Sequence, residues 1–216
     1  MIRKMLVIAA AVAMPVSVVA VTVTSATAAT PKVDATNYTV SCTGIAATAS
    51  FKPALTTAGV TTPTLETTKI SGKATGCTAT PTAGGTAVAI TGATITGTLT
   101  NSSSNLTCGG LATPTTEAGS LTVKWKSNPK LTATSSVATP TSVAGGIGAD
   151  GHATFGISFS GVTGPFQGTD SGASSTNDAE TTTTIAQILN TCNKGLKSIK
   201  IQPDANNPSN PAIHLG

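Results

Sequence analysis

The stretch from Thr86 to Cys108 alternates apolar and polar residues strictly enough to limit what the chain can fold into. In its second half, Ile95 and Leu99 alternate with a series of threonines. A period of two is typical of a β-strand with one buried face and one solvent-exposed face. The first half alternates on the opposite parity, so the phase changes near Gly92. We expect a β-bulge or a bend at that position.

The polar positions of this strand are all threonines, namely Thr94, Thr96, Thr98 and Thr100. They should lie on the solvent side, where their methyl and hydroxyl groups form a flat strip that no lysine or acid interrupts. Thr is a good residue for a solvent-exposed β face, which is a sufficient explanation without any function. The sharper hypothesis is a contact strip for a cell-wall polymer or another surface protein, because a neutral surface avoids the desolvation of charge.

Further strand candidates follow along the chain, separated by Gly, Pro and Asn. The predicted strands cover residues 38–51, 65–78, 120–127, 131–139, 153–162 and 196–202. The strand over 131–139 should end at Pro140, which has no backbone N–H for a sheet. Two apolar trios should be buried together on facing strands: Leu121, Val123 and Trp125, and Phe155, Ile157 and Phe159. Short strands at this spacing predict an all-β fold, an antiparallel β-sandwich or barrel.

One segment near the C-terminus breaks the period of two. An apolar stripe recurs there at intervals of three and four residues: Ile185, Ile188, Leu189 and Cys192. This stripe predicts one short helix between Asp178 and Gly195. Asp178 or an early Thr is the expected N-cap, and Gly195 suits the position just past the end. Residues 203–216, rich in Pro and Asn, are expected to form a loosely ordered tail.

Residues 1–29 have the features of a removable export signal. Two basic residues precede an apolar run over 5–21, and small residues over 26–29 offer a cleavage site. Removal of the signal would leave a single β-rich domain over residues 30–202, with the tail behind it. No second hydrophobic segment follows, so we expect no membrane span after signal removal. The predicted location is extracellular, with association to the cell envelope as an open alternative.

The charge of the chain argues against nucleic acid as a partner. The chain has 12 Lys and Arg against 8 Asp and Glu, and its only Arg, Arg3, belongs to the predicted signal. Phosphate recognition favours the bidentate guanidinium group, which the rest of the chain lacks. We therefore expect no nucleic-acid partner.

Four cysteines lie beyond the predicted signal: Cys42, Cys77, Cys108 and Cys192. An even number in an exported chain predicts two disulfides, and the paired CxxC spacing of a metal site is absent. The sequence alone permits three connectivities. A hairpin folded around residues 55–62 would bring Cys42 opposite the neighbourhood of Cys77. The predicted pairs are therefore Cys42 with Cys77 and Cys108 with Cys192.

Five short motifs follow one another along the chain. They are Cys42-Thr43-Gly44, Phe51-Lys52-Pro53-Ala54-Leu55, Gly76-Cys77, Val123-Lys124-Trp125, and Cys192 followed by Gly195-Leu196. In this order they resemble a family of uncharacterised secreted β-rich proteins of actinobacteria. The resemblance implies export and an all-β body. It brings no activity and no site residues to carry over.

Catalytic and metal-binding motifs are weak. Thr169-Asp170-Ser171-Gly172 is similar to the sequence around the nucleophile of chymotrypsin-like proteases. The only upstream histidine, His152, lies too near, and no separate acid lies between it and Ser171. Asp170, Asp178 and Glu180 are candidate calcium ligands, but the EF-hand spacing is absent. We therefore expect no catalytic residues, no cofactor and no metal site.

Two functional hypotheses remain open. The leading one is a secreted or envelope-associated, non-enzymatic β protein that acts by binding or as a structural surface component. The alternative is a secreted hydrolase whose catalytic carboxylates come together only in the folded chain. A cavity that holds two acids with raised pKa values would favour the hydrolase.

Overall fold

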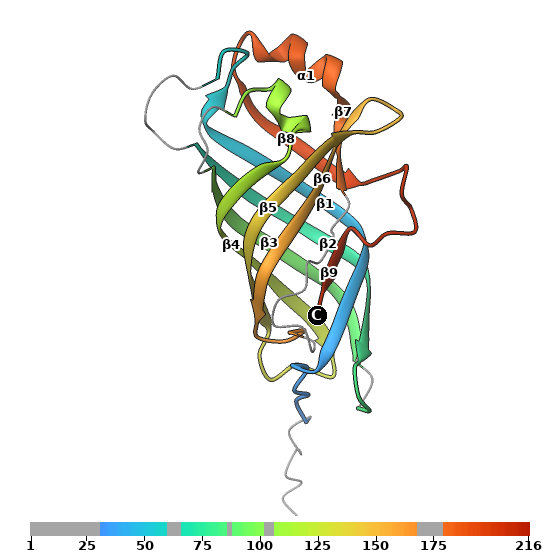
Figure 1. Ribbon diagram of the computed structural model, residues 1–216. Coiled ribbons are helices and arrows are strands. Elements are labelled where there is room, and N and C mark those ends of the chain that lie inside the picture. The colour runs from blue at the N-terminus through green and yellow to red at the C-terminus, as the bar shows by residue number, and fades with distance from the viewer. Residues whose placement is uncertain (1–30, 60–65, 86–87, 102–105, 168–178) are drawn as a thin grey trace, which may run out of the picture.

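The computed structural model describes residues 31–59, 66–85, 88–101, 106–167 and 179–216; the predicted export signal lies outside them. Within these ranges, nine strands form one antiparallel sheet (Figure 1). They are β1 Tyr38–Leu55, β2 Thr67–Pro81, β3 Ala89–Asn101, β4 Thr115–Asn128, β5 Ser135–Ile147, β6 His152–Thr163, β7 Ala179–Thr184, β8 Leu196–Pro203 and β9 Ile213–Leu215. The same ranges contain two helical segments: the 3₁₀ helix η1, Gly109–Ala112, and the α-helix α1, Ile185–Cys192.

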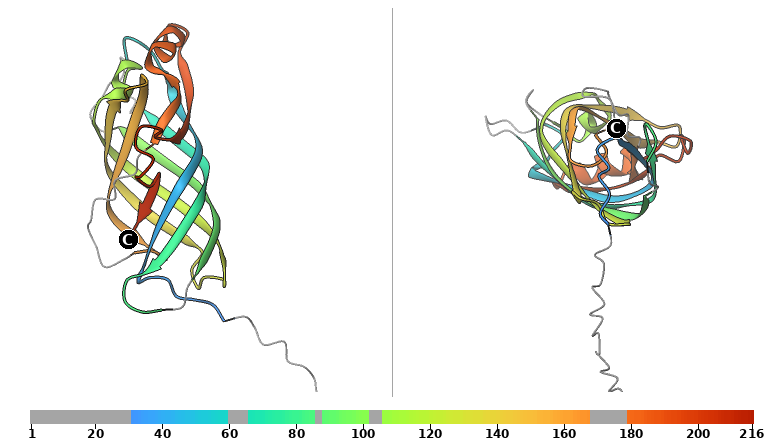
Figure 2. Two further views of the ribbon diagram at one scale, coloured as in Figure 1. Left: turned by 90° about the vertical axis from the view of Figure 1, so that its right-hand side faces the viewer. Right: turned by 90° about the horizontal axis from the view of Figure 1, so that it is seen from below.

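The sheet closes because β1 pairs along both of its edges. One edge pairs with β2 from Tyr38 to Lys52. The other edge pairs with β9 near Val40 and with β8 between Ala47 and Leu55. The remaining strands each pair with their neighbour in sequence, so the end-on view shows a ring (Figure 2). The predicted antiparallel β-sandwich or barrel with one short helix and two disulfides is confirmed, since opposite walls enclose an apolar core.

Two local features of the strands test the expectations about bulges and prolines. The predicted bulge near Gly92 is present, as a register shift between Ile90 and Gly92 with φ of 152° at the glycine. The expected end of a strand at Pro140 is wrong, because β5 continues through Pro140. Register shifts on both sides of Pro140 interrupt the regular pairing there, which accommodates a residue without an N–H.

The segment predicted as one helix over 178–195 contains a strand followed by a shorter helix. Residues 179–184 form β7, which the sequence did not indicate, and α1 begins only at Ile185. Thr184 is the N-cap: its hydroxyl accepts from the Gln187 N–H, and its own N–H donates to the Gln187 side chain. The preceding run of β-branched threonines favours strand over helix, which explains the late start. Gly195 has a φ of 80° just past the end of the helix, as expected.

The segment after β8 is not the loosely ordered tail that its composition suggested. Its last residues form β9, which pairs with Val40 and Cys42 of β1. Ile213 and Leu215 are buried in the same core as Val40. Two alternating apolar residues were therefore enough to complete the ring, despite the surrounding Pro and Asn.

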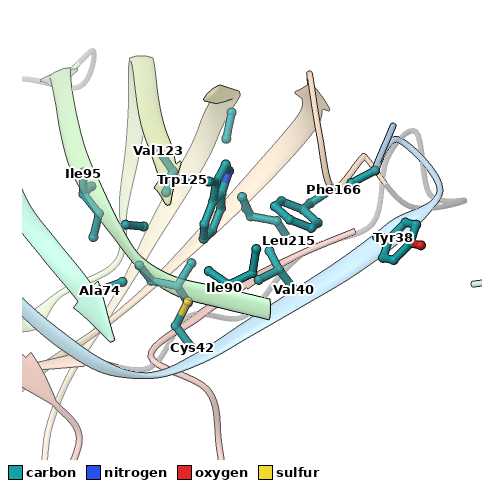
Figure 3. Packing of buried hydrophobic residues seen from close by; sticks show 14 of the residues in the cluster. Tyr38, Val40, Cys42, Ala74, Ile90, Ile95, Val123, Trp125, Phe166 and Leu215 are labelled. Atoms are coloured by element: carbon teal, nitrogen blue, oxygen red, sulfur yellow. The ribbon is translucent and has the colours of Figure 1, made fainter. Parts of the chain in front are cut away.

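The main core lies inside one half of the barrel and is centred on Trp125 (Figure 3). The Trp125 ring meets Phe166 edge to face, with ring centroids 4.9 Å apart and planes at 79°. Its Nε1–H donates to Ser136 Oγ at 2.8 Å, so the buried indole has a polar partner.

The two apolar trios both face the inside of the barrel, although Phe155 packs against the second core cluster rather than the one around Trp125. Leu121, Val123, Trp125 and Phe159 are buried, whereas Phe155 and Ile157 are half-buried because they border a cavity. The two strands are not direct neighbours, since β5 lies between β4 and β6.

Both predicted disulfides are present. Cys42 and Cys77 are directly opposite each other in the β1–β2 hairpin, with Cα atoms 3.9 Å apart. Cys108, just before η1, is bonded to Cys192 at the end of α1, across a sequence separation of 84. Disulfides are compatible with an extracellular protein. None of the helices in the described ranges has the length and apolar character needed to cross a membrane.

Candidate functional site

The interior of the barrel contains two adjoining apolar cavities, of about 80 and about 60 Å³. Four side chains line both of them: Ile70, Phe155, Ile157 and Ile201. These residues come from β2, β6 and β8, which the closed sheet brings around one space. The shared lining makes the two cavities neighbours along the inside of the barrel.

Small residues at inward positions leave this space open. Ala49 contributes only a methyl group to the first cavity, and Ala47 and Ala179 do the same in the second. The side chains that line the second cavity are all apolar. The first cavity has a few polar neighbours, Thr68, Thr113 and Thr115, besides its apolar lining. A ligand in this interior would therefore be apolar over most of its length.

The two ends of the barrel are closed in different ways. At one end, α1 and η1 lie over the opening (Figure 1), and Leu111 and Ile188 pack together with the Cys108–Cys192 disulfide. The core around Trp125 and Phe166 fills the other half. The cavities thus lie between a filled half and a covered end.

Neither interior cavity is lined by a titratable side chain among the described residues. Acid–base catalysis needs such a group within hydrogen-bond reach of a substrate. As far as the described ranges go, the cavity walls are mainly apolar and carry no group for proton transfer.

The predicted contact strip lies on the outer surface, as expected. Thr94, Thr96 and Thr98 are exposed and Thr100 is half-buried. The residues between them, such as Ile95, point into the barrel.

The surroundings of the strip differ from the neutral surface that was expected. Rows of paired residues cross the outside of the wall formed by β8, β1, β2, β3 and β4. The first row is Ser198, Ser50, Lys69, Thr98 and Ser120; the second is Lys200, Thr48, Ser71, Thr96 and Thr122; the third, without β8, is Ala46, Lys73, Thr94 and Lys124. No carboxylate occupies any position of these three rows. We call this surface the lysine–hydroxyl face.

The charge of this face comes from the strands beside β3. Lys69 is directly opposite Thr98. Thr94 lies between Lys73 on one side and Lys124 on the other. The alternation within β3 predicted the strip itself, whereas the neighbouring lysines depend on the pairing register and could not be placed from the sequence.

A hollow of about 530 Å³ lies in the middle of the lysine–hydroxyl face. Its polar lining consists of Lys69 and six hydroxyl residues: Ser50, Ser71, Thr96, Thr98, Ser120 and Thr122. One cation surrounded by hydroxyl groups suits a hydrated, hydroxyl-bearing ligand with negative charge.

No family model, no curated protein and no solved structure matches this chain. The apolar interior and the lysine–hydroxyl face are therefore the basis for a functional proposal. Asp170, Asp178 and Ser171, which the sequence raised as calcium or catalytic candidates, lie outside the described residues. Ile70 and Ile201 were not recognised as cavity residues, because alternation indicates the inward face but not the space in front of it.

Proposed function

We propose that the protein is a secreted or envelope-associated, non-enzymatic binding protein that holds a slim apolar ligand, such as a single alkyl chain, inside the barrel. The observation that carries this proposal is the pair of adjoining cavities that share Ile70, Phe155, Ile157 and Ile201. A closed barrel can hold a small ligand in its interior.

The energetics favour an occupied interior. An empty apolar cavity of about 80 Å³ costs about 2 kcal/mol, at roughly 24 cal/mol per Å³. Apolar cavities stay dry, so water does not offset this cost. An alkyl chain regains the missing dispersion contacts along the cavity walls.

The hydrolase alternative has less support. Among the residues that the structure describes, no carboxylate and no histidine lines any of the three cavities described above. Asp150 lies near Glu180, but its pKa is lowered rather than raised, chiefly because the His152 backbone N–H donates to its carboxylate. A general acid of a hydrolase needs the opposite shift.

Titration of the disulfide-intact protein with cis-parinaric acid, a fluorescent fatty acid, tests the proposal. We expect saturable binding of one molecule per chain. The double variant Ile157→Phe, Ile201→Phe should weaken binding at least about tenfold, because added aromatic volume fills the space that both cavities share. Its folding should be checked by circular dichroism.

Ile147→Phe is the matched control, since Ile147 is 61% exposed on the outside of the barrel. This variant should bind the probe as the wild type does. Absence of saturable binding by the wild type, or an equal loss in Ile147→Phe, would show that the interior is only imperfect packing.

The lysine–hydroxyl face supports a second candidate function, retention on an anionic wall polymer. The supporting observation is the hollow in which Lys69 is surrounded by hydroxyl residues, with Lys73 and Lys124 beside it. Lysines attract phosphate or carboxylate groups as point charges, and hydroxyls hydrogen-bond to a sugar or polyol backbone. Long-range attraction of this kind weakens with salt.

Co-sedimentation with isolated cell envelope tests this second function. The variant Lys69→Gln, Lys73→Gln, Lys124→Gln should lose retention at low salt, because it removes three charges without changing the strands. The wild type should be released by raised salt.

The control removes the same charge elsewhere, with Lys32→Gln, Lys130→Gln, Lys194→Gln, all exposed and outside the three rows. Retention should survive in this control. Equal retention of both variants would contradict this second function, and the threonine strip with its lysines would then be an ordinary solvent-exposed strand surface.

A further inference from the structure

Three side chains of types that bind metal ions lie close together, away from the interior cavities and from the lysine–hydroxyl face. Asp150, His152 and Glu180 each place one ligand atom so that all three atoms lie within 4.8 Å of one another. Asp150 and His152 belong to the β5–β6 turn and the start of β6, and Glu180 belongs to β7. From the sequence, Glu180 was a calcium candidate only together with Asp170 and Asp178, and nothing connected it with Asp150 or His152.

The strand register explains why these side chains meet. Glu180 is directly opposite Thr154 in the β6–β7 pair, and His152 lies two residues before Thr154 on β6, beyond a register shift in the pairing of β6 with β7. Phe155 and Ala179 point to the other face, where both line the second cavity. The cluster is therefore on the outer side of the sheet and separate from the apolar interior.

Glu180 contributes a buried oxygen that no described residue satisfies. The residue is fully buried, with 0% exposure. Its Oε1 accepts from Gln202 Nε2 at 2.8 Å, but its buried Oε2 has no hydrogen-bond partner within the described part of the chain. A buried carboxylate oxygen without a partner is costly, and buried charges are normally paired or coordinate a metal.

His152 and Asp150 add two further ligand atoms. Nδ1 of His152 is buried and lies 2.9 Å from Asp150 Oδ2, at ion-pair distance. This pair leaves both atoms within 4.8 Å of the Glu180 carboxylate, which is close enough for all three to contact one ion. The turn fixes Asp150 independently, because the His152 N–H donates to its other oxygen, Oδ1, at 3.1 Å.

We propose that Asp150, His152 and Glu180 bind one divalent transition-metal ion of the Zn²⁺ class. The imidazole nitrogen favours Zn²⁺ over Ca²⁺ and Mg²⁺, which prefer sites built from oxygen alone. Three protein ligands leave one tetrahedral position for water. Gln202 is a positioning residue, since its amide orients the Glu180 carboxylate. The ion joins the β5–β6 turn to β7 on the outside of the barrel.

Isothermal titration of the purified, disulfide-intact protein with ZnCl₂ tests this site. We expect one Zn²⁺ per chain. Glu180→Gln and His152→Ala should each weaken binding by at least about 100-fold, because loss of even an outer partner of a ligand costs about 10–100-fold. With Co²⁺ as the probe, the wild type should show the visible absorption of a tetrahedral site, and Zn²⁺ should displace it.

His214→Gln is the matched control, because His214 is the other histidine of the chain and lies in β9. This control should bind Zn²⁺ as the wild type does. If Glu180→Gln fails to fold, Asp150→Asn decides the question, since Asp150 is exposed and its replacement should still weaken binding at least about tenfold. Absence of saturable Zn²⁺ binding, tighter binding of Ca²⁺, or full affinity in the folded ligand variants would overturn the proposal.

Discussion

Trp125 shows how much one side chain contributes to this fold. It is 3% exposed, packs edge to face on Phe166 and donates its indole N–H to Ser136. The Ser136 hydroxyl in turn donates to the Pro165 carbonyl. One residue of β4 thereby holds a residue of β5 and the segment that follows β6.

Trp125→Ala should lower the free energy of unfolding by about 3–5 kcal/mol, because it leaves a cavity in the filled half of the barrel. Trp125→Phe should cost less, about 1–3 kcal/mol, since it keeps most of the apolar contact but leaves Ser136 with one partner fewer. Urea denaturation measures both. A loss below about 1 kcal/mol for the Ala variant would contradict the burial of the indole.

For single residues, the sequence predicted the direction of a side chain better than it predicted which residues lie beside it on the next strand. Alternation placed Trp125 and Val123 inward and Thr96 outward, because a strand allows only two directions. It could not show that Lys69 lies beside Thr98, since that contact depends on which residues pair across strands. For the same reason, the sequence could not show that His152 lies close to Glu180.

Among the elements, η1 and α1 act together as the cover of one barrel end. Neither is long enough to be stable alone, since isolated short helices are marginal in water. The Cys108–Cys192 disulfide joins them, and Leu111 and Ile188 pack in the same cluster. The cover is thus held by one covalent bond and a small apolar cluster.

Replacing Cys108 and Cys192 with Ala should lower the free energy of unfolding by about 4–5 kcal/mol, the chain-entropy estimate for a loop of 84 residues. It should also speed the exchange of cis-parinaric acid, because the cover loses its covalent tie. Urea denaturation and stopped-flow fluorescence measure the two effects.

The comparison variant replaces Cys42 and Cys77, which close a shorter loop within the β1–β2 hairpin. It should destabilise the protein somewhat less and leave ligand exchange unchanged. Equal acceleration of exchange in both variants would mean that α1 and η1 do not control access.

Element boundaries were harder to predict than element types. The stripe of Ile185, Ile188 and Cys192 correctly indicated a helix, but the threonines before it belong to a strand. Pro140 does not end β5, because register shifts on both sides of it accommodate the missing N–H, and the sequence cannot show where such shifts occur. The strand β9 was missed because three residues are too few for a periodic signal.

For the whole molecule, composition and strand spacing were sufficient to predict an all-β fold with two disulfides. They could not predict that β1 would pair with β8 and β9, since closure depends on the sum of all the registers around the ring. The interior cavities follow from that closure, as their shared lining comes from β2, β6 and β8. The function of the protein was therefore harder to predict from the sequence than its fold class or its disulfides.

The pairing of β1 with β8 and β9 also bears on the order of events during synthesis. β1 is made before the other strands, and it has only β2 to pair with until β8 and β9 have been made. A long unpaired edge invites pairing with other chains. Contacts between distant parts of a chain also form slowly. The nascent chain is therefore most vulnerable to aggregation while it is incomplete. The second edge of β1 is paired only after β8 and β9 have been made.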